Sequence, residues 1–328
     1  MRVLVTGASG HLGANLARRL LDEGQTVRVL DRGADAHAFS GLDVEVVRGD
    51  VRDAGTIHAV VRGCAQVYHC AAKVSTADRG HREIFETNVL GTRHVLQAAR
   101  AGGVDRVVVT GSFSAVGHHP GRASDETTPV DPFARLSPYQ RSKVAVEHEC
   151  LKAVADGLDV VIATSCAIVG PNDFKPSRMG ALLLDFARGR LRAYIPGGFE
   201  FVTARDIVTG HRLAMDKGRT GQKYIFSSEF KTVDALMEIY ERVTGRRRPR
   251  LRLPASVMAR AADVTNIVQA LVAPRAEPRF TPDAVRLLRM GRRADITKAR
   301  TELGYEPTPV ESAIREAYDD FVRRGVLR

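Results

Sequence analysis

A glycine-rich turn near the amino terminus constrains the fold more than any other feature of the sequence. Residues 2–6 form an apolar run typical of a buried strand, and Gly7, Gly10 and Gly13 follow it at three-residue spacing. Leucines then recur at helical spacing. Glycine lets the backbone approach a pyrophosphate closely, and the free N–H groups at a helix N-terminus attract negative charge. Strand, glycine turn and helix together predict a dinucleotide-binding site.

Two charged residues after the next apolar run bear on which dinucleotide binds. Asp31 lies eighteen residues beyond Gly13. A carboxylate there accepts hydrogen bonds from both ribose hydroxyls and repels a 2′-phosphate, which favours NAD. Arg32 keeps NADP open, because a neighbouring guanidinium can hold a 2′-phosphate. We assign Asp31 and Arg32 to the cofactor site, together with His11 and Leu12 at the start of the preceding helix.

Apolar runs alternate with helical patterns through the first half of the chain. Strands are expected at residues 2–6, 26–30, 44–47, 66–69, 106–110 and 159–164. This alternation implies right-handed crossovers and an α/β fold, a doubly wound parallel sheet of the Rossmann type. Beyond it, helices are expected near residues 206–217, 231–244, 254–272 and 309–324. 

The change of rhythm after Gly170 and Pro171 suggests a boundary between two units. We expect a dinucleotide-binding Rossmann domain over residues 1–170. The remainder, residues 171–328, is expected to form a smaller, mostly helical lobe that binds substrate, with a segment near 201–228 returning to the large domain.

Composition and charge narrow the class of protein. The 328 residues carry a formal charge of +11, but the basic residues are spread along the chain, so no nucleic-acid partner is expected. Four cysteines lack the spacing of a zinc or redox pair, which favours reduced thiols and a cytoplasmic protein. The amino terminus lacks the pattern of a signal peptide, and no apolar stretch has the length of a transmembrane helix.

Three further patterns are interpreted as structural. The basic run Arg246–Arg252 is typical of a solvated loop. The apolar residues 254–272 suggest a packed lid helix rather than one on a membrane surface. His118 and His119 have no acidic or thiol partner at ligand spacing, so no metal site is expected.

Tyr139 and Lys143 are the strongest candidates for catalysis. Their i, i+4 spacing places them on one face of a helix predicted over residues 138–155. A free phenol has a pKa of about 10, too high for a base near neutral pH. A nearby ammonium stabilises the phenolate and is expected to lower that pKa, so that the phenol can exchange a proton with a substrate oxygen.

With these motifs in place, the sequence resembles the extended short-chain dehydrogenase/reductase family. The resemblance covers nearly the whole chain and points to the NAD-dependent epimerase/dehydratases, in the dihydroflavonol-reductase-like and hopanoid-associated sugar epimerase branch. Besides the glycine turn and the Tyr139–Lys143 pair, the cues are the stretches Glu86–Thr92, Asp125–Pro129, Gly170–Pro171, Val202–Ile207 and Leu303–Pro307.

The resemblance implies roles for further residues. Ser112 matches the catalytic hydroxyl that would hold the substrate oxygen near Tyr139, and Ser114 is its rival. Lys143 would also contact the nicotinamide ribose. The remaining matches to the family's cofactor site are Asp50 and Val51 beside the adenine, Ala71 and Ala72 beside the nicotinamide, Asn88 near the cofactor, and Ser165 after the sixth strand.

Departures from the family pattern bear on the reaction. The family's epimerases place an Asn after the sixth strand, where Ala167 follows Cys166 here. Its dehydratases carry an Asp–Glu pair where Phe113 and Ser114 follow Ser112, so dehydration is not expected. Arg205 could grip a substrate diphosphate or form an ion pair with Asp206 at a helix start.

These patterns favour an NAD(P)-dependent oxidoreductase that moves a hydride at a secondary alcohol or ketone of a small-molecule substrate. The alternatives are a nucleotide-sugar epimerase with retained NAD and a non-catalytic sensor of the NAD(P) state. The resemblance also implies a homodimer that pairs through the helices near residues 83–101 and 138–155.

Overall fold

The structure, a computed structural model, describes residues 1–33, 36–75, 80–253 and 282–327. The lid helix expected over 254–272 lies outside the described residues. No helix within the described ranges is long and apolar enough to cross a membrane.

A seven-stranded sheet forms the centre of the larger domain, in the order β10-β6-β5-β4-β1-β2-β3. Every neighbouring pair is parallel, which confirms the doubly wound α/β fold. The strands are β1 (Arg2–Thr6), β2 (Thr26–Asp31), β3 (Val44–Arg48), β4 (Gln66–His69), β5 (Arg106–Ser112), β6 (Val160–Ser165) and β10 (Lys223–Phe226). The strand order reverses between β1 and β4, and ligands of such sheets bind at the carboxyl ends of the strands near this point.

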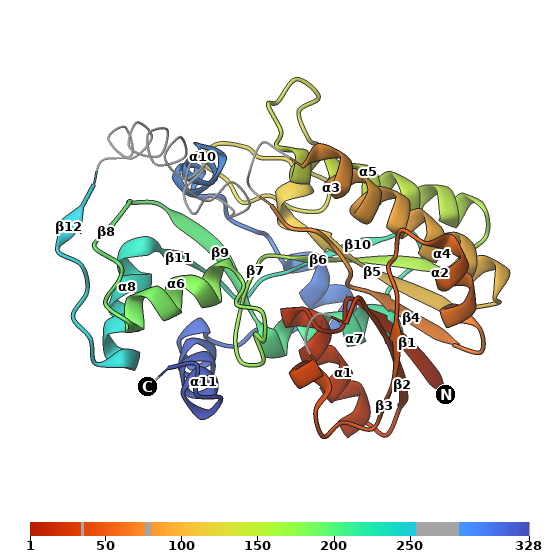
Figure 1. The fold of residues 1–328 in the computed structure, drawn as a ribbon. Coiled ribbons are helices and arrows are strands. Elements are labelled where there is room, and N and C mark those ends of the chain that lie inside the picture. The colour runs from red at the N-terminus through yellow and green to blue at the C-terminus, as the bar shows by residue number, and fades with distance from the viewer. Residues whose placement is uncertain (34–35, 76–79, 254–281, 328) are drawn as a thin grey trace.

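Helices cover both faces of this sheet (Figure 1). Residues of α1 (His11–Asp22) and α7 (Ala204–Lys217) share one apolar core with the strands. Residues of α2 (Ala54–Val61), α4 (Gly91–Ala101) and α5 (Pro138–Ala155) form a second core on the opposite face. Two buried faces explain why the strands are continuous apolar runs rather than alternating ones.

The helix expected over residues 83–101 contains a change of pitch. It consists of α3 (His81–Phe85), a π-helical turn over Glu86–Leu90, and α4. Gly91 begins α4 and packs against the loop that follows β3. A Cβ added to Gly91 would lie 2.7 Å from Val51 Cγ2. Single π-helical turns within α-helices frequently occur at functional sites.

The smaller lobe contains both helices and short strands. Its helices are α6 (Arg178–Ala187), α8 (Val233–Thr244), α10 (Pro282–Met290) and α11 (Val310–Arg323). Its strands are β7 (Ala167–Val169), β8 (Ala193–Tyr194), β9 (Gly198–Thr203), β11 (Glu229–Thr232) and β12 (Leu251–Arg252), in a three-stranded and a two-stranded sheet. The mostly helical lobe expected from the sequence therefore also has strands, too short to produce a clear two-residue periodicity.

The basic run at residues 246–252 lies on the surface of this lobe. Arg248 pairs with Glu238 at 2.6 Å, and Arg252 pairs with Asp234 at 2.9 Å. Because both acidic partners belong to α8, these two arginines carry little free positive charge toward a partner molecule.

Candidate active site

The glycine turn is tightly packed against the end of β4. Gly7 has a φ of +68°, and a Cβ added there would lie 2.6 Å from Ala71 Cα. An added Cβ at Gly13 would lie 2.5 Å from the Gly7 carbonyl oxygen. Substitution at either glycine would therefore require the backbone to move. We call the turn formed by Gly7, Gly10 and Gly13 at the carboxyl end of β1 the cofactor cradle.

The amino end of α1 faces this cradle with free backbone donors. The first backbone bond of the helix runs from Ala14 N–H to the Gly10 carbonyl, at 2.9 Å. The N-cap residue Gly10 has no side chain that could accept from the N–H groups of the first turn, which follow it. The donors of His11, Leu12 and Gly13 are therefore available to a phosphate, together with the positive end of the helix dipole.

Asp31 lies at the rim of the same turn. Its carboxylate is buried and accepts hydrogen bonds from both N–H and hydroxyl of Ser9, and from Gly33 N–H at 3.0 Å. Arg32 is largely exposed and lies 4.0 Å from Asp50. Since the buried group is the carboxylate and the guanidinium is outside, the arrangement fits a ribose diol better than a 2′-phosphate.

The expected adenine-side residues follow β3. Asp50 accepts hydrogen bonds from Arg52 at 2.7 Å, and that guanidinium lowers the pKa of the carboxyl. The Val51 carbonyl accepts a hydrogen bond from His94 Nδ1 at 3.1 Å. Both residues are therefore held by neighbouring side chains, at the edge of the sheet where Arg32 also lies.

The fold brings Ser112 and Tyr139 together. A capping box between Ser137 and Gln140 starts α5, so Tyr139 lies in its first turn. The Ser112 side chain at the end of β5 lies near enough to the Tyr139 hydroxyl to lower the phenol pKa. Ser114 lies 2.8 Å from Ser112, between their Oγ atoms, so both serine candidates share one hydrogen-bonded group.

Lys143 is buried one helical turn further along α5. It is 5% exposed, and its Nζ donates to the Thr110 carbonyl at 2.9 Å. Burial lowers the pKa of Lys143 to about 8. The ammonium is thus fixed beneath the end of β5 by a backbone group rather than by a carboxylate.

One expectation about this pair needs correction. We expected Lys143 to lower the pKa of Tyr139, but burial raises it above its ordinary value, and the neighbouring Ser112 side chain opposes that rise only in part. The physical reason is that removing the phenolate from water outweighs this single contact. In this structure the phenol is therefore a proton donor in its resting form.

The residues after β6 and at the start of α7 were assigned to different parts of the site. Ser165, expected at the cofactor, donates from Oγ to the carbonyl of Cys166, a residue expected on the substrate side, at 2.9 Å, and burial raises the pKa of the Cys166 thiol. Ala167 begins β7 and is half-buried. Arg205 points to the surface, where it pairs with Glu316 at 3.1 Å with 69% of its side chain exposed. 

Neither role considered for Arg205 matches these contacts. Asp206 instead accepts hydrogen bonds from Ser228 at 2.6 Å and from Thr308 N–H at 2.8 Å, which fix the start of α7. Arg205 therefore lies apart from the catalytic group. Near His118 and His119, and elsewhere in the described ranges, no group of His, Cys, Asp or Glu could hold a metal ion.

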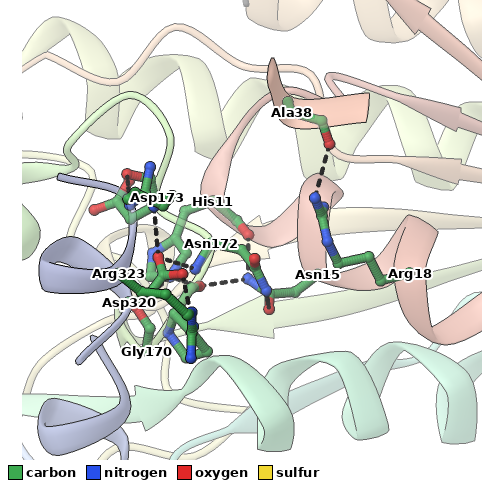
Figure 2. Close-up of polar contacts among 11 residues, drawn as sticks. His11, Asn15, Arg18, Ala38, Gly170, Asn172, Asp173, Asp320 and Arg323 are labelled. Atoms are coloured by element: carbon green, nitrogen blue, oxygen red, sulfur yellow. Dashed lines mark hydrogen bonds and ion pairs between the residues drawn. The ribbon is translucent and has the colours of Figure 1, made fainter. Parts of the chain in front are cut away.

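Helix α1 also connects the cofactor cradle to the smaller lobe, as Figure 2 shows. His11 Nε2 donates to the carbonyls of Gly170 and Pro171, each at 3.1 Å. Asn15 donates to the Pro171 carbonyl at 2.9 Å and accepts from Asn172 at 3.0 Å. The helix expected to bind the pyrophosphate is thus joined directly to the loop that leads into the smaller lobe.

Sequence comparison agrees with this geometry. Residues 3–226, more than half of the chain, match the NAD dependent epimerase/dehydratase family. The chain belongs to this family. Its enzymes use NAD, and the glycine cradle, the uncapped amino end of α1 and the buried Asp31 of this chain fit that cofactor.

Curated members of the NAD dependent epimerase/dehydratase family resemble the chain over its whole length. Sterol demethylase protein B of Methylococcus capsulatus is 44% identical over 328 residues, with all of both chains covered. A putative dihydroflavonol 4-reductase of Synechocystis is 32% identical, over 99% of this chain and 95% of the relative. The 3 beta-hydroxysteroid dehydrogenase/Delta 5-->4-isomerase of Mycobacterium tuberculosis is 30% identical, over 98% of this chain and 90% of the relative.

Solved structures of the same family share the fold. The crystal structure of gox2253 superposes with a TM-score of 0.86 at 31% identity, covering 99% of each chain. The dTDP-glucose 4,6-dehydratase DesIV of Streptomyces venezuelae, solved with NAD bound, gives a TM-score of 0.81 at 25% identity, over 100% of this chain and 99% of that one. The resemblance inferred from the sequence motifs is therefore confirmed, as are the enzyme class and NAD as cofactor.

Several polar residues of the site were missed by sequence reasoning. His69, Thr6 and Thr92 are buried and hydrogen-bonded to one another around the end of β4. A histidine at the end of an apolar strand was the only signal for them in the sequence, and such a residue is equally typical of a packed core.

Proposed function

We propose that the chain catalyses NAD-dependent hydride transfer at a secondary alcohol or ketone, with Tyr139 as the group that transfers the proton. The grouping of Ser112, Tyr139 and Lys143 around the end of β5 carries this proposal. It places two hydroxyl groups together at the carboxyl edge of the sheet, where one substrate oxygen could contact both.

In the direction of reduction, each residue has a defined role. Tyr139 donates its proton to the carbonyl oxygen, and Ser112 hydrogen-bonds the same oxygen and orients it. The bound dinucleotide supplies the hydride in this direction and accepts it in the reverse one. The raised pKa of Tyr139 suits proton donation. In the direction of oxidation, Tyr139 would accept the proton of the alcohol while Ser112 holds the same oxygen.

Lys143 acts on the position of the cofactor rather than by direct proton transfer. Its ammonium is fixed on the Thr110 carbonyl, two residues before Ser112. From there it would hold the ribose next to the nicotinamide when the cofactor is bound. We therefore assign Lys143 to cofactor orientation.

The substrate class that we propose is a hydroxyl or ketone on a sterol-like, polycyclic apolar molecule. The names of two relatives support it, a sterol demethylase protein at 44% identity and a 3 beta-hydroxysteroid dehydrogenase at 30%. The residues after β6 support it as well. Cys166 is buried and Ala167 is half-buried, and neither side chain could bind several sugar hydroxyls.

The direct test follows the absorbance of the reduced nicotinamide. Purified protein should oxidise NADH with 3-ketosteroids, or reduce NAD with 3β-hydroxysteroids, faster than with UDP-sugars. Tyr139→Phe should lower kcat by about a thousandfold while NADH binding stays within about twofold, because only the proton-transferring oxygen is lost. A Tyr139→Phe protein with unchanged turnover would contradict the assignment.

Epimerisation with retained cofactor is the second candidate, because the matched family includes NAD-dependent epimerases. It requires NAD to remain bound through purification, and a product formed without net change in nicotinamide absorbance. The surface position of Arg205 removes one group that could have gripped a nucleotide diphosphate. Mass spectrometry of the purified protein and NMR of a UDP-sugar incubation separate the two candidates.

We also propose a homodimer that pairs through α4 and α5. Leu151 on α5 is 52% exposed, an unusual position for a large apolar side chain in a helix of the central domain. Light scattering at high protein concentration should give twice the chain mass, and Leu151→Glu should shift it toward the monomer. A monomer for the unaltered protein would remove this expectation.

A further inference from the structure

A buried histidine contacts both the cofactor cradle and a helix of the catalytic face. His69 ends β4 and is 2% exposed. Its Nδ1 lies 2.7 Å from Thr6 Oγ1, and its Nε2 lies 2.9 Å from Thr92 Oγ1. Thr6 directly precedes Gly7, and Thr92 lies in the first turn of α4. The imidazole therefore bridges two segments that are far apart in the sequence.

At the cradle side, one hydroxyl contacts both a backbone donor and the imidazole. Ala71 N–H donates to Thr6 Oγ1 at 3.3 Å. The Thr6 hydroxyl keeps its own proton and can donate it to His69 Nδ1. Ala71 is also the residue whose backbone packs against Gly7. This end of the chain of hydrogen bonds therefore joins the two walls of the cradle.

The opposite end fixes the direction of both hydrogen bonds of the imidazole. The Asn88 carbonyl can only accept, and it accepts from the Thr92 hydroxyl at 2.6 Å. Thr92 Oγ1 must then accept from His69, so the imidazole proton resides on Nε2. Both ring nitrogens are satisfied by the neutral tautomer, and burial lowers the pKa of His69 to about 3, which keeps that form at neutral pH.

From Asn88 the hydrogen bonds continue to the catalytic helix. The side chain of Asn88 donates to Ser142 Oγ at 2.9 Å and to the Lys73 carbonyl at 3.0 Å, and it accepts from Lys73 N–H at 2.7 Å. Ser142 in turn donates to the Tyr139 carbonyl at 2.7 Å. From Ala71 the hydrogen bonds run in one direction to the Asn88 carbonyl, and the side chain of the same residue then links them to Ser142 and the backbone of Tyr139.

We propose that His69 is a positioning residue, which holds the dinucleotide cradle in register with the helix that carries Tyr139 and Lys143 through the fixed polarity of this hydrogen-bonded path. The part of this proposal that concerns catalysis rests on the proposed role of Tyr139. The part that concerns the glycine cradle predicts an effect on NAD binding and does not depend on catalysis. A leucine at this position would fill similar volume but leave the hydroxyls of Thr6 and Thr92 without their buried partner.

The experiment measures NADH affinity by fluorescence and kcat at saturating NADH, in the full chain. We expect His69→Leu to weaken NADH binding about tenfold and to lower kcat about tenfold, because buried polar groups lose their partner at both ends. His69→Gln keeps an N–H donor near the Nε2 position and should recover part of kcat. Val160→Ala is the control, since Val160 is fully buried at the amino end of β6, at the opposite edge of the sheet from the carboxyl ends of the strands.

Non-additivity distinguishes positioning from simple loss of stability. Thr92→Val breaks the same path one step later, so the double variant His69→Leu/Thr92→Val should bind NADH no more than about twofold worse than His69→Leu. The control should lower the melting temperature with NADH affinity unchanged. Multiplied effects in the double variant, or unaltered NADH affinity in His69→Leu, would overturn the proposal. If no alcohol or ketone is turned over, the proposed function fails, while the NADH titrations still decide the role of His69.

Discussion

Lys143 donates a hydrogen bond from its ammonium to the backbone carbonyl of Thr110, 2.9 Å away, and this contact sets the electrostatics of the catalytic face. The Thr110 hydroxyl lies 2.9 Å from His211 Nε2, so the same residue is held from its other side. A cation buried against a neutral carbonyl costs free energy of folding, because the loss of hydration outweighs the attraction of Glu147, the carboxylate that acts on it. Such a cost is expected where a charge serves catalysis rather than stability.

Lys143→Met should therefore inactivate the protein and stabilise it. The pKa of Lys143 is lowered from 10.5 to about 8, which corresponds to a folding cost of about 3 kcal/mol at pH below 8. The lost hydrogen bond to Thr110 offsets about 1 kcal/mol of that gain. Urea unfolding without cofactor should give a variant about 2 kcal/mol more stable near neutral pH. 

The pH dependence of this difference provides its control. The unfolded chain binds the lysine proton up to its pKa of 10.5, whereas the folded chain releases it near 8, so the unaltered protein gains stability between these values. The gap between Lys143→Met and the unaltered protein should shrink over that range. A gap that stays constant would mean that Lys143 is not buried as an ammonium.

Ser112→Ala should impair turnover far more than Ser114→Ala. Ser112 is the serine beside the Tyr139 hydroxyl, and its loss removes the one contact that lowers the phenol pKa. We expect kcat to fall about a hundredfold for Ser112→Ala and less than about tenfold for Ser114→Ala, at saturating NADH. Steady-state kinetics on the best substrate from the ketosteroid panel measures both. Equal losses would place the substrate oxygen between the two serines instead.

Asp31→Asn should shift the preference between the two dinucleotides. The neutral amide keeps an acceptor for Ser9 but no longer repels a 2′-phosphate, and exposed Arg32 lies beside it. The ratio of NADPH to NADH dissociation constants should fall by about tenfold, as expected for the removal of one like charge near the phosphate. Fluorescence titration with each reduced dinucleotide is the measurement. Adding Arg32→Ala to Asp31→Asn should reverse most of the shift.

Two buried histidines should make the fold sensitive to mild acid. Burial lowers the pKa of His211 from 6.5 to about 4, and that of His69 to about 3. Below pH 6.5 the unfolded chain gains these two protons while the folded chain does not, so stability falls as the pH falls. Each histidine contributes a slope of up to about 1.4 kcal/mol per pH unit.

His211→Gln isolates one of these two contributions. His211 accepts from Thr110 at Nε2 and donates from Nδ1 to the Ile207 carbonyl at 2.8 Å, so the amide retains part of this bonding. Urea unfolding between about pH 6 and 5 should show a slope reduced by about one proton in the variant. His37→Gln is a surface control that should leave the slope unchanged, since this histidine is exposed. An unchanged slope in His211→Gln would show that the imidazole titrates freely in the fold.

The sequence by itself was sufficient for the architecture and for the type of cofactor site. Alternating apolar runs and helical patterns specify a parallel sheet covered on both faces, because local periodicity follows from backbone geometry. The spacing of Gly7, Gly10 and Gly13 and the i, i+4 spacing of Tyr139 and Lys143 are also local properties. They could therefore be recognised without knowing what lies around them.

Only the tertiary structure decided the electrostatic state of the site and the residues behind it. The pKa of Tyr139 depends on burial by segments distant in the sequence, which outweighs any local pattern. The sequence places Arg205 at a helix start, whether it binds a diphosphate or pairs with Asp206. Only the tertiary structure shows that it pairs with Glu316 on α11 instead. His69 acquires its role from Thr6 and Thr92, partners that no local spacing can identify, because hydrogen-bond direction is fixed only when distant chain segments meet.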